Sequence, residues 1–220
     1  MSVNTFISLP QHTARPMPAM RVLCFLGLMS VFAGCVSVPA TKTEPSTTAQ
    51  ALRAQHLQQL ASIQQFSIQG RIGVQTNGKG FSGSLQWQHN NAEDIIDLYS
   101  PLGSQVASIK KTADQVTLTD SSGKSFSAAD AETLTQQTLG WKLPLTGLSD
   151  WSIGRPTQSP IQSSSWNEQG LLTNLDQDGW KIEYDNYAQQ DAYMLPGKIF
   201  LKSDKLNLKL LVEKWNSLEQ

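Results

Sequence analysis

The hydrophobic pattern of the chain changes its period near residue 65. Before that point, apolar residues recur at spacings of three and four, which predicts a half-buried helix from about Thr47 to Gln64. Its apolar stripe consists of Ala54, Leu57, Leu60, Ala61 and Ile63. From Phe66 onward, apolar and polar residues alternate, as they do in a strand with one buried face. The pattern therefore predicts a helix that covers a sheet.

Alternating segments continue through most of the chain and are separated by short turns. The first two, 66–74 and 81–87, flank the turn sequence Thr76-Asn77-Gly78-Lys79-Gly80 and predict a β-hairpin. The other predicted strands are 94–99, 105–110, 115–119, 124–126, 166–167, 171–175, 180–186, 198–202 and 206–215. A single antiparallel sheet of this many strands must curl.

Two short helices are expected between the strands. Ser127-Ala128-Ala129-Asp130 resembles a capping box, so one helix should open there and stop at Gly140. A second is predicted at 148–153, before Gly154. The fold class is therefore mainly β with helices (α+β). It consists of one curled antiparallel sheet whose concave side is filled by about three helices, leaving either a packed core or a groove.

The N-terminal 34 residues read as an export signal that is removed. Arg15 and Arg21 precede an apolar run, 22–33, that is too short to span a bilayer. The run ends at Phe32-Ala33-Gly34-Cys35, which resembles a bacterial lipobox. We therefore expect Cys35 to be acylated and to become the first mature residue. An ordinary signal followed by a buried Cys is the alternative.

The residues after Cys35 indicate where the protein goes and how far it reaches. Val36 and Ser37 differ from the Asp that retains lipoproteins at the inner membrane, which favours the outer membrane. Residues 36–50 carry few large apolar side chains and read as a tether, with a root-mean-square reach of roughly 20 Å. The predicted organisation is a signal at 1–34, an acylated tether at 35–50 and one domain at 51–220.

Composition and motifs narrow the function classes. The 220 residues carry a net charge of −1, without the clustered basic residues that nucleic-acid binding requires. His56 and His89 have no nucleophile at catalytic spacing. The run from Asn174 to Gly179 resembles the start of a calcium loop, but Asp-Gly between strands is first of all a turn. We expect no enzyme activity, no metal and no cofactor.

Tryptophan is the most informative residue type. All six tryptophans follow residue 86, at Trp87, Trp141, Trp151, Trp166, Trp180 and Trp215. Aromatic residues on the inner face of a sheet usually form a packed core, but a site for fatty acyl chains has the same composition. The residues alone leave both interpretations open.

Several segments, in their order along the chain, resemble the LolB family of outer-membrane receptors for lipoproteins. The resemblance covers residues 50–220, behind the lipobox. It is carried by Ile96–Ser104, Asp130–Glu132, Leu143–Leu145, Trp151–Pro156, Gly179–Tyr184 and Leu206–Trp215. It implies a half-closed β-barrel of about 11 strands, lidded by helices around an apolar cavity. It also implies that a periplasmic carrier, LolA, hands over acylated lipoprotein cargo, which this chain inserts into outer-membrane phospholipid. We expect a monomer.

The resemblance also assigns candidate site residues. Together with their alternation along the strands, it favours an acyl-chain cavity lined by Trp87, Trp151, Trp180, Trp215, Leu85, Ile182 and Leu210. In the family, the loop that corresponds to Pro101-Leu102-Gly103 protrudes and inserts into the bilayer, whereas in a generic protein Leu102 would tuck against the sheet edge. The alternative function is a non-catalytic scaffold or assembly lipoprotein of the outer membrane with an ordinary packed core.

Overall fold

The structure is a computed structural model that describes residues 47–76 and 78–219. All described residues belong to one compact unit. The predicted signal, the lipidation site Cys35 and most of the tether lie outside the described residues.

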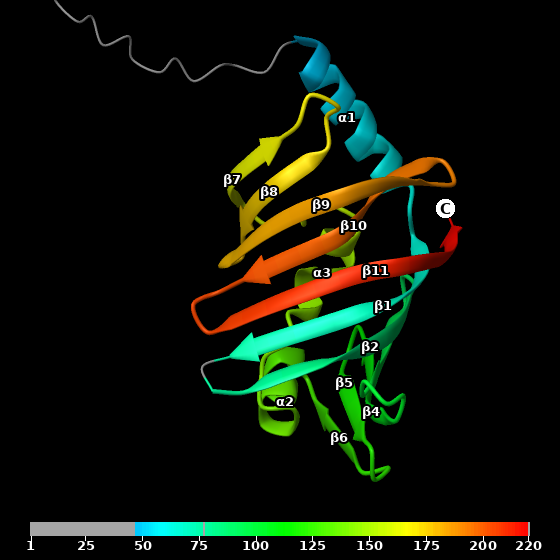
Figure 1. Ribbon diagram of the computed structural model, residues 1–220, viewed down its shortest axis with the longest axis vertical. Coiled ribbons are helices and arrows are strands. Elements are labelled where there is room, and N and C mark those ends of the chain that lie inside the picture. The colour runs from blue at the N-terminus through cyan, green and yellow to red at the C-terminus, as the bar shows by residue number, and fades with distance from the viewer. Residues whose placement is uncertain (1–46, 77, 220) are drawn as a thin grey trace, which may run out of the picture. The chain divides into compact units, whose positions relative to one another are not determined.

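The described residues form three helices and eleven strands (Figure 1). The helices are α1 (Thr47–Ala61), α2 (Ala131–Thr138) and α3 (Leu145–Ser152). The strands are β1 (Gln65–Thr76), β2 (Gly80–His89), β3 (Glu93–Tyr99), β4 (Gln105–Thr112), β5 (Val116–Asp120), β6 (Ser125–Ala128), β7 (Ile161–Trp166), β8 (Leu172–Gln177), β9 (Trp180–Gln190), β10 (Tyr193–Lys202) and β11 (Leu206–Glu219).

All eleven strands belong to one antiparallel sheet. Their order is β6-β5-β4-β3-β2-β1-β11-β10-β9-β8-β7, so two meanders meet where β1 pairs with β11. That pairing extends from Gln65 opposite Glu219 to Thr76 opposite Leu206. Within residues 47–76 and 78–219, β6 and β7 each have a neighbour on one side only, so the barrel does not close. The half-closed barrel of about 11 strands is confirmed.

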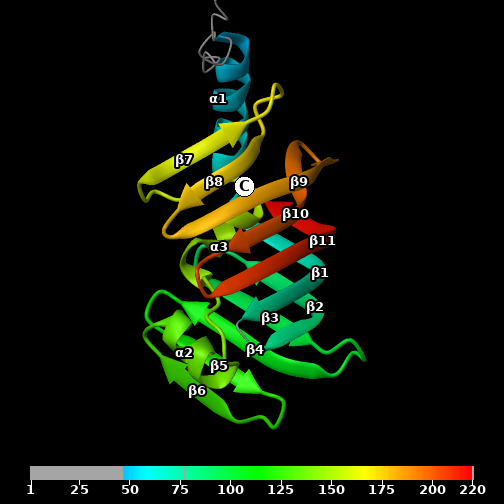
Figure 2. The ribbon, with the colours of Figure 1, turned by 60° about the vertical axis from the view of Figure 1, so that its left-hand side comes forward.

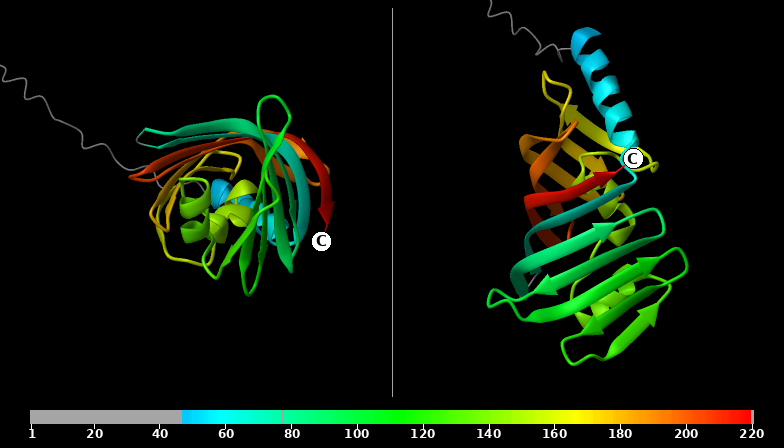
Figure 3. Two further views of the ribbon diagram at one scale, coloured as in Figure 1. Left: turned by 90° about the horizontal axis from the view of Figure 1, so that it is seen from below. Right: turned by 90° about the vertical axis from the view of Figure 1, so that its right-hand side faces the viewer.

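Helices α2 and α3 lie inside the curve of the sheet. Seen along the curl, the strands arch over the two helices (Figure 3, left panel). Side chains alternate along each strand, so one set points inward to the helices and forms a continuous hydrophobic core. Figure 2 shows α2 beside β5 and β6 at one end of the sheet. The sheet therefore has a helix-covered concave face and a bare outer face.

The two short helices begin at other residues than predicted. Ser127, the first residue of the predicted capping box, lies in β6. The N-cap of α2 is Asp130, whose carboxylate accepts hydrogen bonds from the backbone N–H groups of Glu132 and Thr133, each at 3.1 Å. Helix α3 is Leu145–Ser152 rather than 148–153, because Pro144 fixes its start. Both short helices exist, but their first turns lie elsewhere than the sequence predicted.

Two strands differ most from their predicted ranges. Strand β10 begins at Tyr193 instead of residue 198, because Pro196 and Gly197 interrupt the sequence pattern while Tyr193 and Leu195 still point inward. Strand β7 covers Ile161–Trp166 instead of 166–167, and most of it is polar and exposed. An edge strand pairs through its backbone on one side, so its side chains need no strict alternation.

Helix α1 packs on the sheet mainly through its C-terminal half. Leu60 is buried, but Ala54 and Ala61 are exposed, which corrects the predicted stripe. His56 is buried instead, at 5% exposure, with its ring 6.5 Å from that of Tyr187. Burial lowers the pKa of the His56 imidazole, and its Nε2 atom has no hydrogen-bond partner in the described part of the chain. The N-terminal part of the helix extends past the sheet (Figure 1).

Strands β1 and β11 approach so closely that one position tolerates no side chain. A Cβ atom at Gly70 would lie 2.1 Å from the carbonyl oxygen of Leu211. Gly70 also sits beside a register shift between β1 and β11. At Gly73, three residues further along β1, an added Cβ would meet nothing within 4 Å. The two glycines therefore form a matched pair for testing this approach.

We expect Gly70→Ala to lower the free energy of unfolding by about 1–3 kcal/mol, because the backbone of β11 must shift. Gly73→Ala should change it by less than about 0.5 kcal/mol. Urea unfolding of a soluble form without residues 1–35 provides the measurement. Equal effects of the two substitutions would contradict the close approach at Gly70.

Candidate functional site

The concave face and its helices enclose an apolar region with almost no empty space. A cavity of about 10 Å³ remains there, roughly the room for one water molecule. It is lined entirely by apolar side chains: Ile72, Leu85, Trp87, Ile96, Leu143, Leu148, Leu208 and Leu210. In the state that the structure describes, the protein's own side chains fill the concave side.

The structure brings three of the seven predicted cavity residues together at this place. Leu85, Trp87 and Leu210 line the small cavity. Trp151, Trp180 and Ile182 belong to the same buried core but not to the lining. Trp215 is only partly buried and packs edge-on against Phe66, with ring centroids 5.7 Å apart.

Sequence reasoning missed five lining residues. Ile72, Ile96 and Leu208 alternate with polar neighbours on their strands, so period-two patterning already placed them on the inner face. Leu148 lies in α3, and Leu143 lies in the segment just before it. No sequence signal shows which strand residues such a segment will contact, because the contact depends on the curl of the sheet.

The two most deeply buried indoles are fixed by hydrogen bonds. Trp87 and Trp151 are each 1% exposed. The Nε1–H of Trp87 donates to Asp94 at 2.9 Å, and that of Trp151 donates to Gln177 at 3.0 Å. A buried indole N–H needs such an acceptor. These bonds set the orientation of both rings on the concave side.

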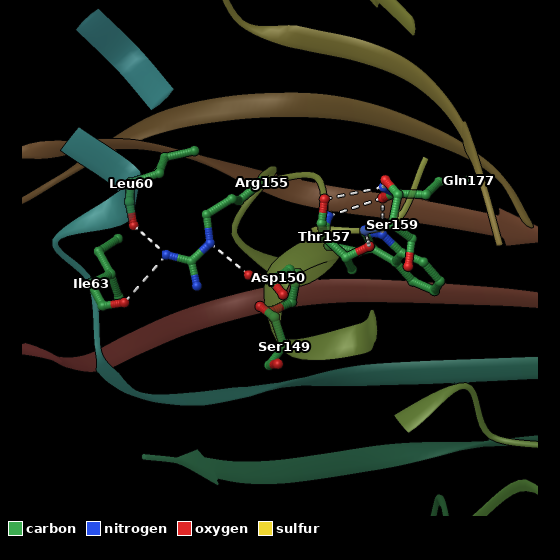
Figure 4. Close-up of polar contacts among 10 residues, drawn as sticks. Leu60, Ile63, Ser149, Asp150, Arg155, Thr157, Ser159 and Gln177 are labelled. Carbon is green, nitrogen blue, oxygen red and sulfur yellow. Dashed lines mark hydrogen bonds and ion pairs between the residues drawn. The ribbon is translucent and has the colours of Figure 1, made fainter. Parts of the chain in front are cut away.

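Gln177 also holds the loop that follows α3. Its Nε2 donates to the carbonyl oxygens of Thr157 at 3.2 Å and Ser159 at 2.7 Å (Figure 4). Its Oε1 accepts from the backbone N–H of Thr157 at 3.0 Å. One side chain at the end of β8 therefore joins Trp151 of α3 to the segment before β7.

Arg155 joins α3 to the end of α1 (Figure 4). Its Nε donates to Asp150 at 2.6 Å, and its Nη1 donates to the carbonyl oxygens of Leu60 at 2.6 Å and Ile63 at 3.4 Å. Carbonyl groups at a helix C-terminus lack intrahelical donors and carry partial negative charge. Arg155 therefore supplies both a donor and a favourable charge. We call these contacts the Arg155 clasp.

The turn between β3 and β4 presents a bare apolar side chain. Leu102 is 95% exposed. Pro101 precedes it, and Gly103 has a φ of 86°, which a residue with a side chain rarely adopts. Backbone bonds from Gly103 to Ser100 at 2.9 Å and from Ser100 to Ser104 at 2.8 Å fix the turn. Leu102 is a candidate site residue from its Pro-Leu-Gly sequence, and the structure places its side chain in solvent rather than against the sheet edge.

The described helices offer no membrane span: none of them is both long and apolar enough. Together, the fold and the site define a class of half-barrel proteins whose apolar concave face is covered by helices. The family model described as "Outer membrane lipoprotein LolB" matches residues 64–215. The chain therefore belongs to the LolB family of outer-membrane lipoproteins.

Two relatives agree with this assignment by sequence. Outer-membrane lipoprotein LolB of Nitrosomonas europaea is 33% identical over 194 residues, covering 86% of this chain and 90% of that protein. The LolB of Nitrosococcus oceani is 32% identical over 196 residues, covering 89% of this chain and 96% of that protein. Among solved structures, the LolA superfamily protein NE2245 from Nitrosomonas europaea is 11% identical with a TM-score of 0.48, covering 77% of this chain and 93% of that one.

We expect Arg155→Ala to lower the free energy of unfolding by about 2 kcal/mol, since the Asp150 carboxylate and the carbonyl groups of Leu60 and Ile63 lose a charged donor. Arg71→Ala is the matched control, because Arg71 makes an exposed ion pair with Glu213 at 2.7 Å. Its loss should cost less than about 1 kcal/mol. Urea unfolding and hydrogen exchange of the α1 amides report both effects. Faster exchange in α1 should accompany Arg155→Ala alone, and equal exchange in both variants would rule out the clasp.

Proposed function

We propose that this protein receives lipoproteins from the periplasmic carrier LolA, shields their acyl chains on its concave face and releases them into the outer membrane. Membership of the LolB family and an exposed Leu102 on a rigid turn support the proposal. Family membership carries most weight, because a single exposed apolar residue is common on soluble proteins. The 95% exposure of Leu102 at the tip of a hydrogen-bonded turn adds a point of contact for a membrane. The role is binding and transfer by a monomer, without catalysis.

The physical need for such a protein is large. A triacylated lipoprotein released into water exposes roughly forty methylene groups, and each costs about 0.8 kcal/mol. The total is tens of kcal/mol, so free diffusion between membranes is negligible. An apolar face that excludes water removes most of this cost during transfer. Transfer without nucleotide hydrolysis requires only that the affinity for the acyl chains is higher in the receptor than in the carrier, and higher still in the bilayer.

Cargo entry requires rearrangement of the covering helices. A cavity of about 10 Å³ admits no acyl chain. Leu143 and Leu148 close it from the helical side, so moving α3 and the segment before it would open a path to Leu85, Trp87 and Leu210. We infer that these residues meet the acyl chains, while the Arg155 clasp keeps the helices in place until cargo arrives.

A transfer assay tests the function directly. A soluble form without residues 1–35 is mixed with carrier that holds radiolabelled lipoprotein. Movement of the label onto this chain supports the receptor role. A stable complex without movement of label would instead support the scaffold, which uses the same fold with a sealed core.

Cys35→Ala is expected to abolish acylation and residence in the outer membrane, because acyl chains on Cys35 are the proposed anchor. Domain stability should be unchanged, as the described fold begins after this position. Membrane fractionation followed by a high-salt wash gives the measurement. A variant that still sediments with the outer membrane contradicts the assignment of Cys35.

Leu102→Glu is expected to fold and to accept lipoprotein from the carrier but to fail in release. Burial of the leucine in a bilayer would gain about 2 kcal/mol, whereas a carboxylate resists leaving water. Ser104→Glu is the matched control, because it adds the same charge to an exposed position of the same turn. Receipt and delivery are assayed separately with liposomes. Loss of receipt, or normal delivery, by Leu102→Glu overturns this role of the turn.

A further inference from the structure

A broad groove of about 890 Å³ lies at one end of the sheet, and its charged side chains belong to the outward-facing set of the strands. It extends over the ends of β1, β2, β9, β10 and β11. Phe200 is part of its lining and lies between the core residues Ile199 and Leu201 of β10, so its ring points outward. The groove shares only the Leu208 lining residue with the small apolar cavity, and its charged side chains lie on the opposite face of the strands.

The groove gathers positive charge. Lys181, Lys202 and Lys209 line it, together with a single carboxylate, that of Glu183. Strand register explains the cluster: Lys202 lies opposite Lys181, and Phe200 lies between Lys209 and Glu183 on the two neighbouring strands. Lys79, the fourth lysine of the lining, extends toward Gly140 instead.

These lysines lack anionic partners. In residues 47–76 and 78–219, none of the three outer-face lysines forms an ion pair. The ammonium group of Lys209 lies 5.4 Å from the centroid of the Phe200 ring. Nearby Lys198, in contrast, is neutralised by Asp185 at 3.3 Å. Like charges on adjacent strands repel one another, so an anion bound here would relieve that repulsion.

The groove and Leu102 lie at the same end of the strands. Because neighbours are antiparallel, β1 and β3 end where β9 and β11 begin, which places the turn after Tyr99 beside the groove's end of the sheet. The β3–β4 turn also projects beyond the outer face (Figure 3, left panel; Figure 2). A flat surface that meets this turn therefore faces the outer side of the sheet.

We propose that the groove binds the phosphate groups of anionic phospholipids and so orients the protein on the membrane while Leu102 enters the apolar layer. This inference rests on the proposed membrane role of Leu102. Lysine ammonium groups bind phosphate as point charges, and a basic face beside an apolar side chain matches the boundary between head groups and acyl chains. An acidic carrier protein fits less well, since cargo must pass to the concave face.

The test compares two triple variants of the form without residues 1–35. Lys181→Gln/Lys202→Gln/Lys209→Gln removes the groove charge. Lys110→Gln/Lys142→Gln/Lys214→Gln removes the same charge from exposed positions outside the lining. Both are sedimented with phosphatidylcholine vesicles that contain or lack phosphatidylglycerol, at low and high salt.

The groove variant should lose affinity for the phosphatidylglycerol vesicles by about fivefold per lysine, on the order of 100-fold in all. The control variant should stay near the unmodified protein, and high salt should remove the difference. Pure phosphatidylcholine vesicles should not distinguish the variants. Equal affinity of the two triple variants for the anionic vesicles overturns the proposal.

Two further arms separate this inference from the proposed function. Leu102→Glu should fail to deliver lipoprotein. Because its groove lysines are intact, it should still bind vesicles that contain phosphatidylglycerol more tightly than vesicles of pure phosphatidylcholine. If the groove variant binds anionic vesicles as well as the unmodified protein does, while Leu102→Glu is still defective in delivery, the groove proposal is rejected and the receptor function stands. A groove variant that loses receipt from the carrier but keeps vesicle affinity identifies a protein-docking site and also rejects the proposal.

Discussion

The pairing of β1 with β11 holds the two halves of the sheet together. Every other strand is connected through consecutive antiparallel neighbours to one of these two, so the sheet has no continuity without this pair. The two strands are separated by most of the domain along the chain, and their contact restricts Gly70 to a residue without a side chain. Such a distant pairing carries a large loop-closure cost, which favours slow folding through β contacts.

The half-closed geometry follows from the same arrangement. Since the central pair joins two meanders, the sheet of the described residues ends in two edge strands, β6 and β7. The curl directs all inward side chains toward a common space that only helices can cover. Helices α2 and α3 occupy it, and Arg155 and Gln177 tie α3 and its following loop to α1 and β8. Polar contacts at the rim thus position an apolar interior.

Much of this fold was predictable because alternation determines which face a residue occupies. It correctly placed Leu85, Trp87, Ile182 and Leu210 inward, and the Pro-Leu-Gly sequence indicated a tight turn with Leu102 at its tip. The pattern failed where backbone pairing alone holds a strand, as in β7, and where Pro196 interrupts one. It also failed for α1, whose contact with the sheet is limited to one half of the helix. How fully the concave side is filled depends on the spacing between sheet and helices, which no local pattern encodes.

The nearly filled concave side has a thermodynamic consequence for a protein that resides at a membrane. If acyl chains bind only to an opened form, the apparent affinity equals the intrinsic affinity multiplied by the fraction of molecules that are open. A closed resting state therefore disfavours the loading of the surrounding phospholipids, which are present in vast excess. The free energy spent on opening is recovered when the core repacks after cargo leaves. Closure of the empty protein therefore favours release of the acyl chains and opposes their rebinding.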